Sequence, residues 1–159
     1  MAKSKIQADI LFITVNNHET AELQKELTKL STSPKTFQGS IHREPYDDYG
    51  IINGQRVIHV TSMMGSGQAG GSRETTKKAL EDLNPQLLIA VGICWGAWED
   101  KDQAIGDVII SQQVQMGHSV KIANHEVVPR GARSETDATV VKLFQAAQRN
   151  HAPDLRTHT

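Results

Sequence analysis

Short apolar runs alternate with helical spacing at the start of the chain. The run DILFITV at residues 9–15 is apolar and rich in β-branched residues, which predicts a strand buried on both faces. Three leucines at helical spacing predict a helix over residues 18–31: Leu23, Leu27 and Leu30. Asn16 or Asn17 is expected to be its N-cap. The chain therefore opens with a β-α unit.

The next segments have the alternating pattern of strands. Residues 35–42 predict one strand, and residues 49–62 predict two strands joined by the hairpin signal Asn53-Gly54. Between them, the YDD stretch at residues 46–48 is interpreted as a polar loop in a segment that could pack at a subunit interface. A β-hairpin is thus expected to precede the glycine-rich stretch that follows.

The remaining pattern returns to alternating helices and strands. Ser72 is expected to cap a helix that runs to about Leu83, and the strand QLLIAVG follows it, so a parallel crossover is predicted. Further strands are expected within residues 104–122 and 125–129, and a last helix begins at Asp137 with one apolar face, formed by Val140, Phe144 and Ala147. This alternation predicts a three-layer α/β/α sandwich with a mixed central sheet.

The glycine-rich stretch HVTSMMGSGQAGGSRETTKKAL has the spacing G-x-G-x-x-G at Gly65, Gly67 and Gly70. A dinucleotide-binding turn also needs an acidic residue about 20 residues further on, at the end of the second strand. Here the nearby acids, Glu81 and Asp82, belong to the intervening helix, and no Gly-Lys-Ser/Thr ending indicates a P-loop. Two interpretations remain: a loop whose backbone N–H groups approach a ligand, or a tight turn without one.

Composition narrows the class of protein. A chain of 159 residues fits one domain, and its net charge of -1 gives no basic field for nucleic acid. The most apolar run is too short to span a membrane and no signal-peptide cleavage site is present, so a soluble cytoplasmic protein is expected.

Cysteine and histidine add little chemistry of their own. The single cysteine, Cys94, has no partner for a disulfide or zinc site and is expected to be a small buried hydrophobe. Four histidines are interpreted as surface or strand residues: His42, His59, His118 and His125. No two of them have the helical i, i+4 spacing that is typical of metal ligands, so no metal site is expected.

Three stretches in register resemble the nucleoside phosphorylase and nucleosidase superfamily: LFITVNNHETAEL, VTSMMGSGQAGG and LLIAVGICWGAWEDKDQAIGDVIIS. In that family a strand ends in a glycine loop beside the purine, and a Gly-Asp pair followed by a β-run comes soon after. Gly92, Gly96 and residues 105–108 match this arrangement. The resemblance covers residues 8–156 and implies a phosphorylase-like fold.

The resemblance also implies a set of site residues. Glu19 matches the carboxylate with which adenosine-type nucleosidases orient and activate water, whereas by itself it would be interpreted as a first-turn glutamate that favours the helix dipole. The loop against the ribose, or against phosphate in phosphorylases, would be formed by Met64, Gly65, Ser66 and Gly67. The base pocket would be lined by Gly92, Ile93, Cys94 and Trp95, of which Trp95 could instead fill the core.

Phosphate ligands distinguish the two branches of the family. Phosphorylases place arginines in the first β-α loop and near the end of the strand before the base-pocket glycine, because a fork of N–H donors suits a phosphate dianion. This chain has NNHE and IAVG at those places, so hydrolysis is favoured over phosphorolysis. Phosphorolysis stays open because some members lend an arginine across a subunit interface from the region of Arg43.

The resemblance further implies where the site is incomplete. Cleavage of an N-glycosidic bond develops positive charge on the ribose, so water held by a carboxylate and a proton donor to the purine are both required. The family's donor aspartate and ribose-binding Met-Glu pair belong to the C-terminal third of the fold. Residues 1–159 are therefore expected to be a single, C-terminally incomplete domain, inactive alone and completed by another chain or by homo-oligomerisation.

These observations predict a cofactor-free N-ribosyl hydrolase module for a purine nucleoside or nucleotide. Whether the chain is itself an enzyme depends on the missing segment. Three alternatives stay open: a non-catalytic nucleotide-binding or nucleoside-binding module, a phosphorolytic phosphorylase, and a structural domain that binds neither ligand.

Overall fold

The computed structural model has two compact units, Met1–Trp95 and Gly96–Thr159. The residues that it describes are 6–32, 37–41, 44–94, 108–115, 120–123, 126–129 and 133–151.

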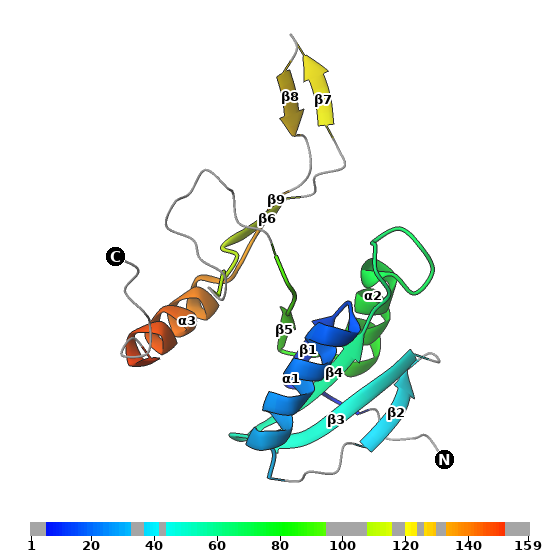
Figure 1. The fold of residues 1–159 in the computed structure, drawn as a ribbon, viewed down its shortest axis with the longest axis vertical. Helices are drawn as coiled ribbons and strands as arrows, with labels where there is room; N and C mark the ends of the chain where they lie inside the picture. The colour runs from blue at the N-terminus through cyan, green and yellow to red at the C-terminus, as the bar shows by residue number, and fades with distance from the viewer. Residues whose placement is uncertain are drawn as a thin grey trace. The chain divides into compact units, whose positions relative to one another are not determined.

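The first unit contains a five-stranded sheet with the order β2-β3-β4-β1-β5 (Figure 1). β1 lies between β4 and β5 and is parallel to both, whereas β3 pairs antiparallel with β2 and β4. The strands span Phe37–Ile41 (β2), Glu44–Ile52 (β3), Gln55–Thr61 (β4), Ile10–Thr14 (β1) and Leu87–Ala90 (β5). The sheet is therefore mixed, and the carboxyl ends of β1, β4 and β5 meet at one edge.

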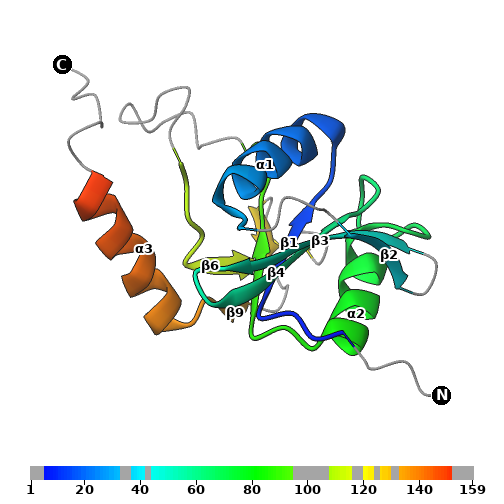
Figure 2. The same cartoon turned by 90° about the horizontal axis from the view of Figure 1, so that it is seen from below.

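Two helices cover this sheet, one on each face. Figure 2 shows α1 (Asn17–Leu30) and α2 (Ser72–Leu83) on opposite sides of β1 and β4. α2 connects β4 to β5, as the predicted parallel crossover requires. The first unit therefore has the three layers and mixed sheet that the sequence predicts.

Successive side chains of a strand point to opposite faces of the sheet, so the apolar residues of the strands form one cluster with α2 and another with α1. Leu11 and Ile58, both fully buried, belong to the core cluster that includes Leu83 of α2. The opposite face of the sheet contributes Val57 and Tyr49 to a cluster with Leu27 of α1. Of the three α1 leucines, Leu27 is buried and Leu23 packs partly against this cluster, but Leu30 is 60% exposed at the helix end.

The interpretation of residues 46–48 as a polar loop is wrong, because they lie within β3. Tyr46 is buried in the core beside Ile58 and Val60. Asp48 is also buried, where it forms an ion pair with Arg56 of β4 and accepts a hydrogen bond from the backbone of Gly50. The ion pair with Arg56 across the hairpin allows the Asp48 carboxylate to be buried in a strand, although its polarity predicts a loop.

The predicted turns are mostly found in place. Asn53 and Gly54 join β3 to β4 with φ angles of 50° and 82°, the left-handed conformations that an Asn-Gly hairpin turn favours. The start of α2 differs by one residue, since Gly71 occupies the N-cap position and Ser72 is the first helical residue. Asn84 ends this helix in the left-handed conformation.

The second unit has two small antiparallel sheets and one helix. β6 (Gln113–Gln115) pairs with β9 (Arg133–Glu135), and β7 (Val120–Ala123) pairs with β8 (Glu126–Pro129). α3 (Ala138–His151) starts after Asp137, whose Oδ1 accepts a hydrogen bond 2.7 Å long from Thr139 N. In contrast to the strand predicted within residues 104–122, residues 108–110 are not in a strand and their apolar side chains are exposed.

None of the helices in the described part of the chain combines the length and the apolar character that crossing a membrane would require.

Candidate functional site

The first turn of α1 lies beside the carboxyl end of β1 and is closed by a capping box. Asn16 is the N-cap, and its Oδ1 accepts hydrogen bonds from His18 N and Glu19 N at 2.9 and 3.0 Å. In return, Glu19 Oε2 accepts from Asn16 N at 3.2 Å. The capping box satisfies backbone donors that a helix start leaves without partners, and it fixes the direction of the Glu19 side chain.

Glu19 also joins the end of β1 to the segment after β5. Its Oε2 accepts a second hydrogen bond from Val15 N at 3.1 Å, and its Oε1 accepts one from Ile93 N at 2.8 Å. The carboxylate therefore holds three backbone N–H groups from two segments that are far apart in the sequence. It is a structural link as well as a charged group at this edge of the sheet.

These contacts determine the charge of Glu19. Desolvation is the largest single contribution and raises the pKa of the carboxyl group, but the hydrogen bonds from Ile93, Val15 and Asn16 together outweigh it and lower the pKa. Glu19 is consequently ionised at neutral pH. An ionised carboxylate only accepts hydrogen bonds, so it can hold a water molecule through one of the water's protons.

Gly92 gives the Glu19 carboxylate the space that it occupies. A Cβ atom at position 92 would lie 3.1 Å from Glu19 Oε1, closer than ordinary van der Waals contact. The φ angle of Gly92 is not positive, so the backbone conformation itself does not demand glycine here. A side chain at this position would therefore require the Glu19 carboxylate to shift, whereas the backbone conformation would not resist it.

The glycine-rich loop between β4 and α2 is closed by its own backbone. Gly65 O accepts a hydrogen bond from Ser72 N at 2.9 Å, and Met63 N donates to Gly70 O at 2.9 Å. Gly65 and Gly70 have positive φ angles of 93° and 74°. At Gly71 a Cβ atom would lie only 2.6 Å from Gly65 O, so this tight turn excludes any larger residue.

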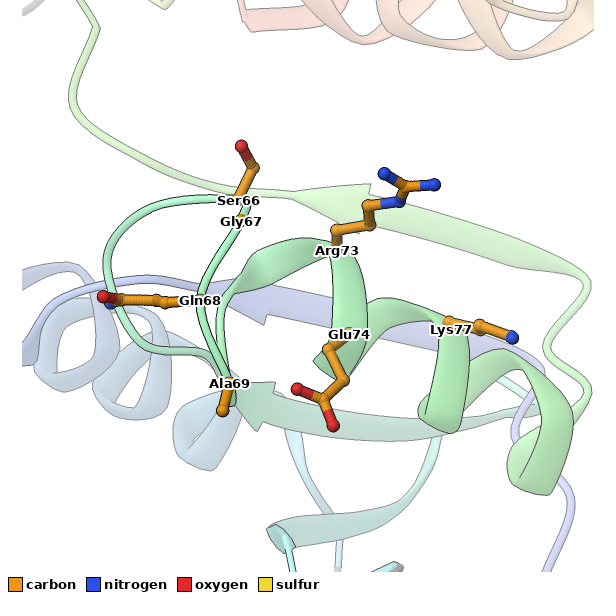
Figure 3. A pocket seen from close by; sticks show the side chains of 7 residues that line it. All are labelled: Ser66, Gly67, Gln68, Ala69, Arg73, Glu74 and Lys77. Atoms are coloured by element: carbon orange, nitrogen blue, oxygen red, sulfur yellow. The ribbon is translucent and has the colours of Figure 1, made fainter.

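A cavity of about 480 Å³, open to solvent, lies between this loop and α2. Figure 3 shows its lining side chains, which come from the loop on one wall and from the first two turns of α2 on the other. Arg73 and Lys77 contribute positive charge, and Glu74 contributes a carboxylate that already accepts hydrogen bonds from Gly70 N and Lys78 Nζ. The full lining is Ser66, Gly67, Gln68, Ala69, Arg73, Glu74 and Lys77.

The residues selected from the sequence form two groups. Glu19, Gly92 and Ile93 are in direct contact, whereas Ser66 and Gly67 lie in the cavity wall beside α2. No hydrogen bond between described residues joins Glu19 to the glycine loop. The loop residue Met64 has an exposed side chain, and its carbonyl accepts a hydrogen bond from the Gln68 side chain.

Cys94 is exposed, so the expectation that it is a small buried hydrophobe is wrong. It follows the end of β5 in a segment where Gly92 and Ile93 are exposed as well. The roles predicted for Trp95, Arg43 and the Gly-Asp pair at residues 106–107 lie outside the described residues.

Sequence reasoning missed a group of threonines at the same edge of the sheet. Thr14 and Thr61 end β1 and β4 as register partners. Thr20, next to Glu19, places its hydroxyl 2.6 Å from that of Thr14 and 3.3 Å from that of Thr61. The sequence signal for this group is that two predicted strands, which pair in parallel, both end in threonine.

His59 is a buried strand residue in β4, while the other three histidines weighed as metal ligands are outside the described residues. Within the described ranges, no group of three or more histidine, cysteine or acidic residues is arranged to hold a metal ion.

The capping box gives a stability prediction. Replacing Asn16 with alanine removes the acceptor of two backbone N–H groups, and we expect it to lower the free energy of unfolding by about 1 kcal/mol. Chemical denaturation followed by circular dichroism measures this loss. Glu22→Ala on the exposed side of α1 serves as the control and should stay within about 0.5 kcal/mol of the wild type. Equal stability of the Asn16→Ala variant would contradict the prediction.

Comparison with known proteins identifies the family. The sequence matches the profile of the Phosphorylase superfamily over residues 10–159. The chain belongs to the phosphorylase superfamily.

Two relatives of this phosphorylase-superfamily chain have informative names. A Death domain-containing ATP nucleosidase from Amphimedon queenslandica is 27% identical over 101 residues, which are 63% of this chain and 18% of that protein. A crystal structure of a mutant MTAN from Helicobacter pylori, with 5'-methylthioadenosine in the active site, matches with a TM-score of 0.70 and 16% identity. That match covers 92% of this chain and 61% of the MTAN chain, and it confirms the phosphorylase-like fold.

Proposed function

We propose that this chain is a module of an N-ribosyl hydrolase that cleaves the N-glycosidic bond of a purine nucleoside or nucleotide. The observation that carries the proposal is the Glu19 carboxylate, ionised and held by backbone N–H groups from the ends of β1 and β5. The names of both similar proteins include an adenine compound: one is an ATP nucleosidase, and the other is an MTAN whose active site contains 5'-methylthioadenosine.

The chemistry proposed for Glu19 is to orient a water molecule toward the anomeric carbon of the ribose. Its oxygens accept three backbone hydrogen bonds, and a carboxylate has about four lone-pair sites, so one site is left for a water proton. Because the backbone groups fix the carboxylate before substrate arrives, its charge needs no reorganisation as positive charge develops on the ribose. Hydrolysis of a glycosidic bond uses a carboxylate in this way.

The substrate pocket is proposed to combine both groups of residues selected from the sequence. Gly92, Ile93, Cys94 and Trp95 would surround the base, and the ribose side would be formed by Met64, Gly65, Ser66 and Gly67. β5 pairs with β1 alone among the described strands, and an open edge of this kind favours a partner, which we propose to be a second copy or a complementing chain.

A ligand titration tests the proposed function. Adenosine, 5'-methylthioadenosine, AMP and ATP are each added to the 159-residue chain, and the melting temperature and the release of free base are followed together. We expect at least one of them to raise the melting temperature. Base release is measured with protein in excess over ligand, so that a single turnover is detected.

The possible outcomes separate the alternatives. Stabilisation with Glu19-dependent base release supports the hydrolase module, and stabilisation without any base release favours a non-catalytic binding module. Base release that depends on added inorganic phosphate would indicate phosphorolysis. No shift in melting temperature with any of the four compounds would contradict the proposal.

The cavity beside Ser66 favours a substrate that carries phosphate. Its lining has two cationic side chains, Arg73 and Lys77, of which Lys77 lies 3.9 Å from Glu81 Oε1, and the one carboxylate in the lining, Glu74, is paired with Lys78. Arg73 is exposed, and its guanidinium can form two parallel hydrogen bonds to a phosphate group.

Replacing Arg73 with alanine therefore discriminates between substrate classes. We expect it to weaken the binding of ATP about fivefold and to leave the binding of adenosine unchanged, as loss of one solvent-exposed charged contact predicts. Isothermal titration with both ligands measures the two affinities. Arg133→Ala, in β9 of the second unit, is the control for charge. Equal losses for ATP and adenosine would argue against a phosphate contact at Arg73.

A further inference from the structure

A chain of five polar side chains runs from the interior of the first unit to the carboxyl edge of the sheet. His59 Nδ1 lies 3.4 Å from Asp47 Oδ2, and His59 Nε2 lies 2.9 Å from Thr14 Oγ1. The Thr14 hydroxyl is 2.6 Å from that of Thr20, which in turn is 3.3 Å from that of Thr61. The elements that contribute are β3, β4, β1 and α1, so one network connects three strands of the sheet to the helix that carries Glu19.

The buried end of this network has little freedom. Thr14 is fully buried and His59 is 1% exposed, so neither side chain can exchange its partner for water. Asp47 Oδ2 is itself fixed by a hydrogen bond 2.8 Å long from Gln24 Nε2. A buried imidazole between a carboxylate and a hydroxyl has one arrangement that satisfies both neighbours.

That arrangement sets the direction of every proton in the network. A carboxylate accepts hydrogen bonds, so the Asp47 side of His59 is Nδ1–H. Burial lowers the pKa of His59 more than its hydrogen bond and its attraction to Asp47 raise it, and the imidazole is neutral at neutral pH. Nε2 is then an acceptor for the Thr14 hydroxyl, Thr14 accepts from Thr20, and Thr20 accepts from Thr61.

We propose that His59 is a positioning residue for Glu19, and that it acts through the ordered hydroxyls of Thr14 and Thr20. Thr20 directly follows Glu19 in the first turn of α1, and its hydroxyl joins that turn to the ends of β1 and β4. The network therefore contacts this turn through Thr20, in addition to the contact of Glu19 with Ile93. This inference rests on the function proposed for Glu19, but its structural part is measurable without any substrate.

Variants of Thr20 test the proposal. Thr20→Val removes the hydroxyl and keeps the shape, whereas Thr20→Ser keeps the hydroxyl. The matched control is Thr28→Val on the same helix, where the lost hydroxyl donates only to the carbonyl of Gln24. The readouts are the pKa of Glu19 from carboxyl carbon NMR, the affinity for 5'-methylthioadenosine, and the melting curve that shows each variant to be folded.

We expect Thr20→Val to raise the pKa of Glu19 toward its ordinary value and to weaken ligand binding about fivefold, because the turn that carries Glu19 loses both hydroxyl contacts of Thr20. Thr20→Ser and Thr28→Val should leave both quantities as in the wild type. A folded Thr20→Val chain with an unchanged Glu19 pKa overturns the proposal. If the wild-type chain binds none of the purine compounds, the proposed function fails, and the Glu19 pKa alone then decides about the positioning role.

A measurement on the wild-type chain keeps the test independent of folding defects. Nitrogen NMR of the His59 ring distinguishes the two neutral tautomers, and we expect the proton on Nδ1. A proton on Nε2 would reverse the order of donors and acceptors that the proposal needs, and it would overturn the inference even if every variant failed to fold.

Discussion

Replacing Glu19 with glutamine is expected to slow base release at least about a hundredfold, the lower range for removing a group that acts on a proton in the transition state. The affinity for the nucleoside should fall only about tenfold, through the weakened contact with Ile93, because the proposed carboxylate contact is to the attacking water rather than to the bound substrate. Glutamine has the same shape but only one acceptor oxygen. It can replace either the contact with Ile93 or the capping contacts, but not both.

The same substitution has a structural cost that must be separated from the catalytic one. We expect the free energy of unfolding to fall by about 1 kcal/mol, the usual value of a helix cap. Single-turnover base release is therefore measured at a temperature at which every variant is fully folded. Asp137→Ala, which removes the side-chain cap of α3, is the control for a lost cap outside the candidate site. A Glu19→Gln chain that releases base at the wild-type rate would exclude Glu19 from the reaction.

The pH dependence of stability provides a second check on Glu19. Its pKa is lower in the folded chain than in the unfolded chain, so its ionisation stabilises the fold above the unfolded pKa. That contribution is lost as the pH falls through the folded pKa. The stability difference between wild type and Glu19→Gln should therefore be largest at neutral pH and shrink in acid, as denaturation at a series of pH values would show.

Local signals in the sequence predicted the first unit well. The apolar run before the capping asparagine, the Asn-Gly turn and the strand-loop-helix-strand order gave β1, the β3–β4 hairpin and the parallel crossover. Each is a short-range pattern, because periodicity and turn chemistry act within a few residues. The error at residues 46–48 arose where a buried aspartate is compensated by Arg56 on the next strand, a pairing that no local pattern contains.

The candidate site was predictable only through the resemblance. Glu19 alone is a first-turn glutamate, and the structure shows that it does have that capping role. Its contact with Ile93 joins residues 74 positions apart, which only the parallel arrangement of β1 and β5 brings together. The threonine network depends in the same way on register, since Thr14 and Thr61 face each other across β1 and β4.

Replacing Gly92 with alanine is the second large effect that we expect. The added Cβ would lie 3.1 Å from Glu19 Oε1, and the carboxylate cannot move away without stretching one of its three backbone hydrogen bonds. Loss of the Ile93 contact should raise the pKa of Glu19 toward its ordinary value and weaken nucleoside binding at least about tenfold, which corresponds to about 1.4 kcal/mol. Carboxyl carbon NMR and isothermal titration measure the two effects.

Global stability at neutral pH should fall only by the contribution that the lowered pKa of Glu19 makes, which distinguishes this variant from a core substitution. Gly92 is exposed and has no positive φ angle, so alanine introduces neither a buried volume nor backbone strain. Gly67→Ala is the control for the pKa of Glu19, because a Cβ there meets no atom within 4 Å. If Gly92→Ala leaves the titration of Glu19 unchanged, the segment after β5 moves freely enough to relieve the contact. The link between β5 and α1 would then hold Glu19 less firmly than its hydrogen bonds indicate, and its role as a preorganised carboxylate would depend on the contacts with Val15 N and Asn16 N.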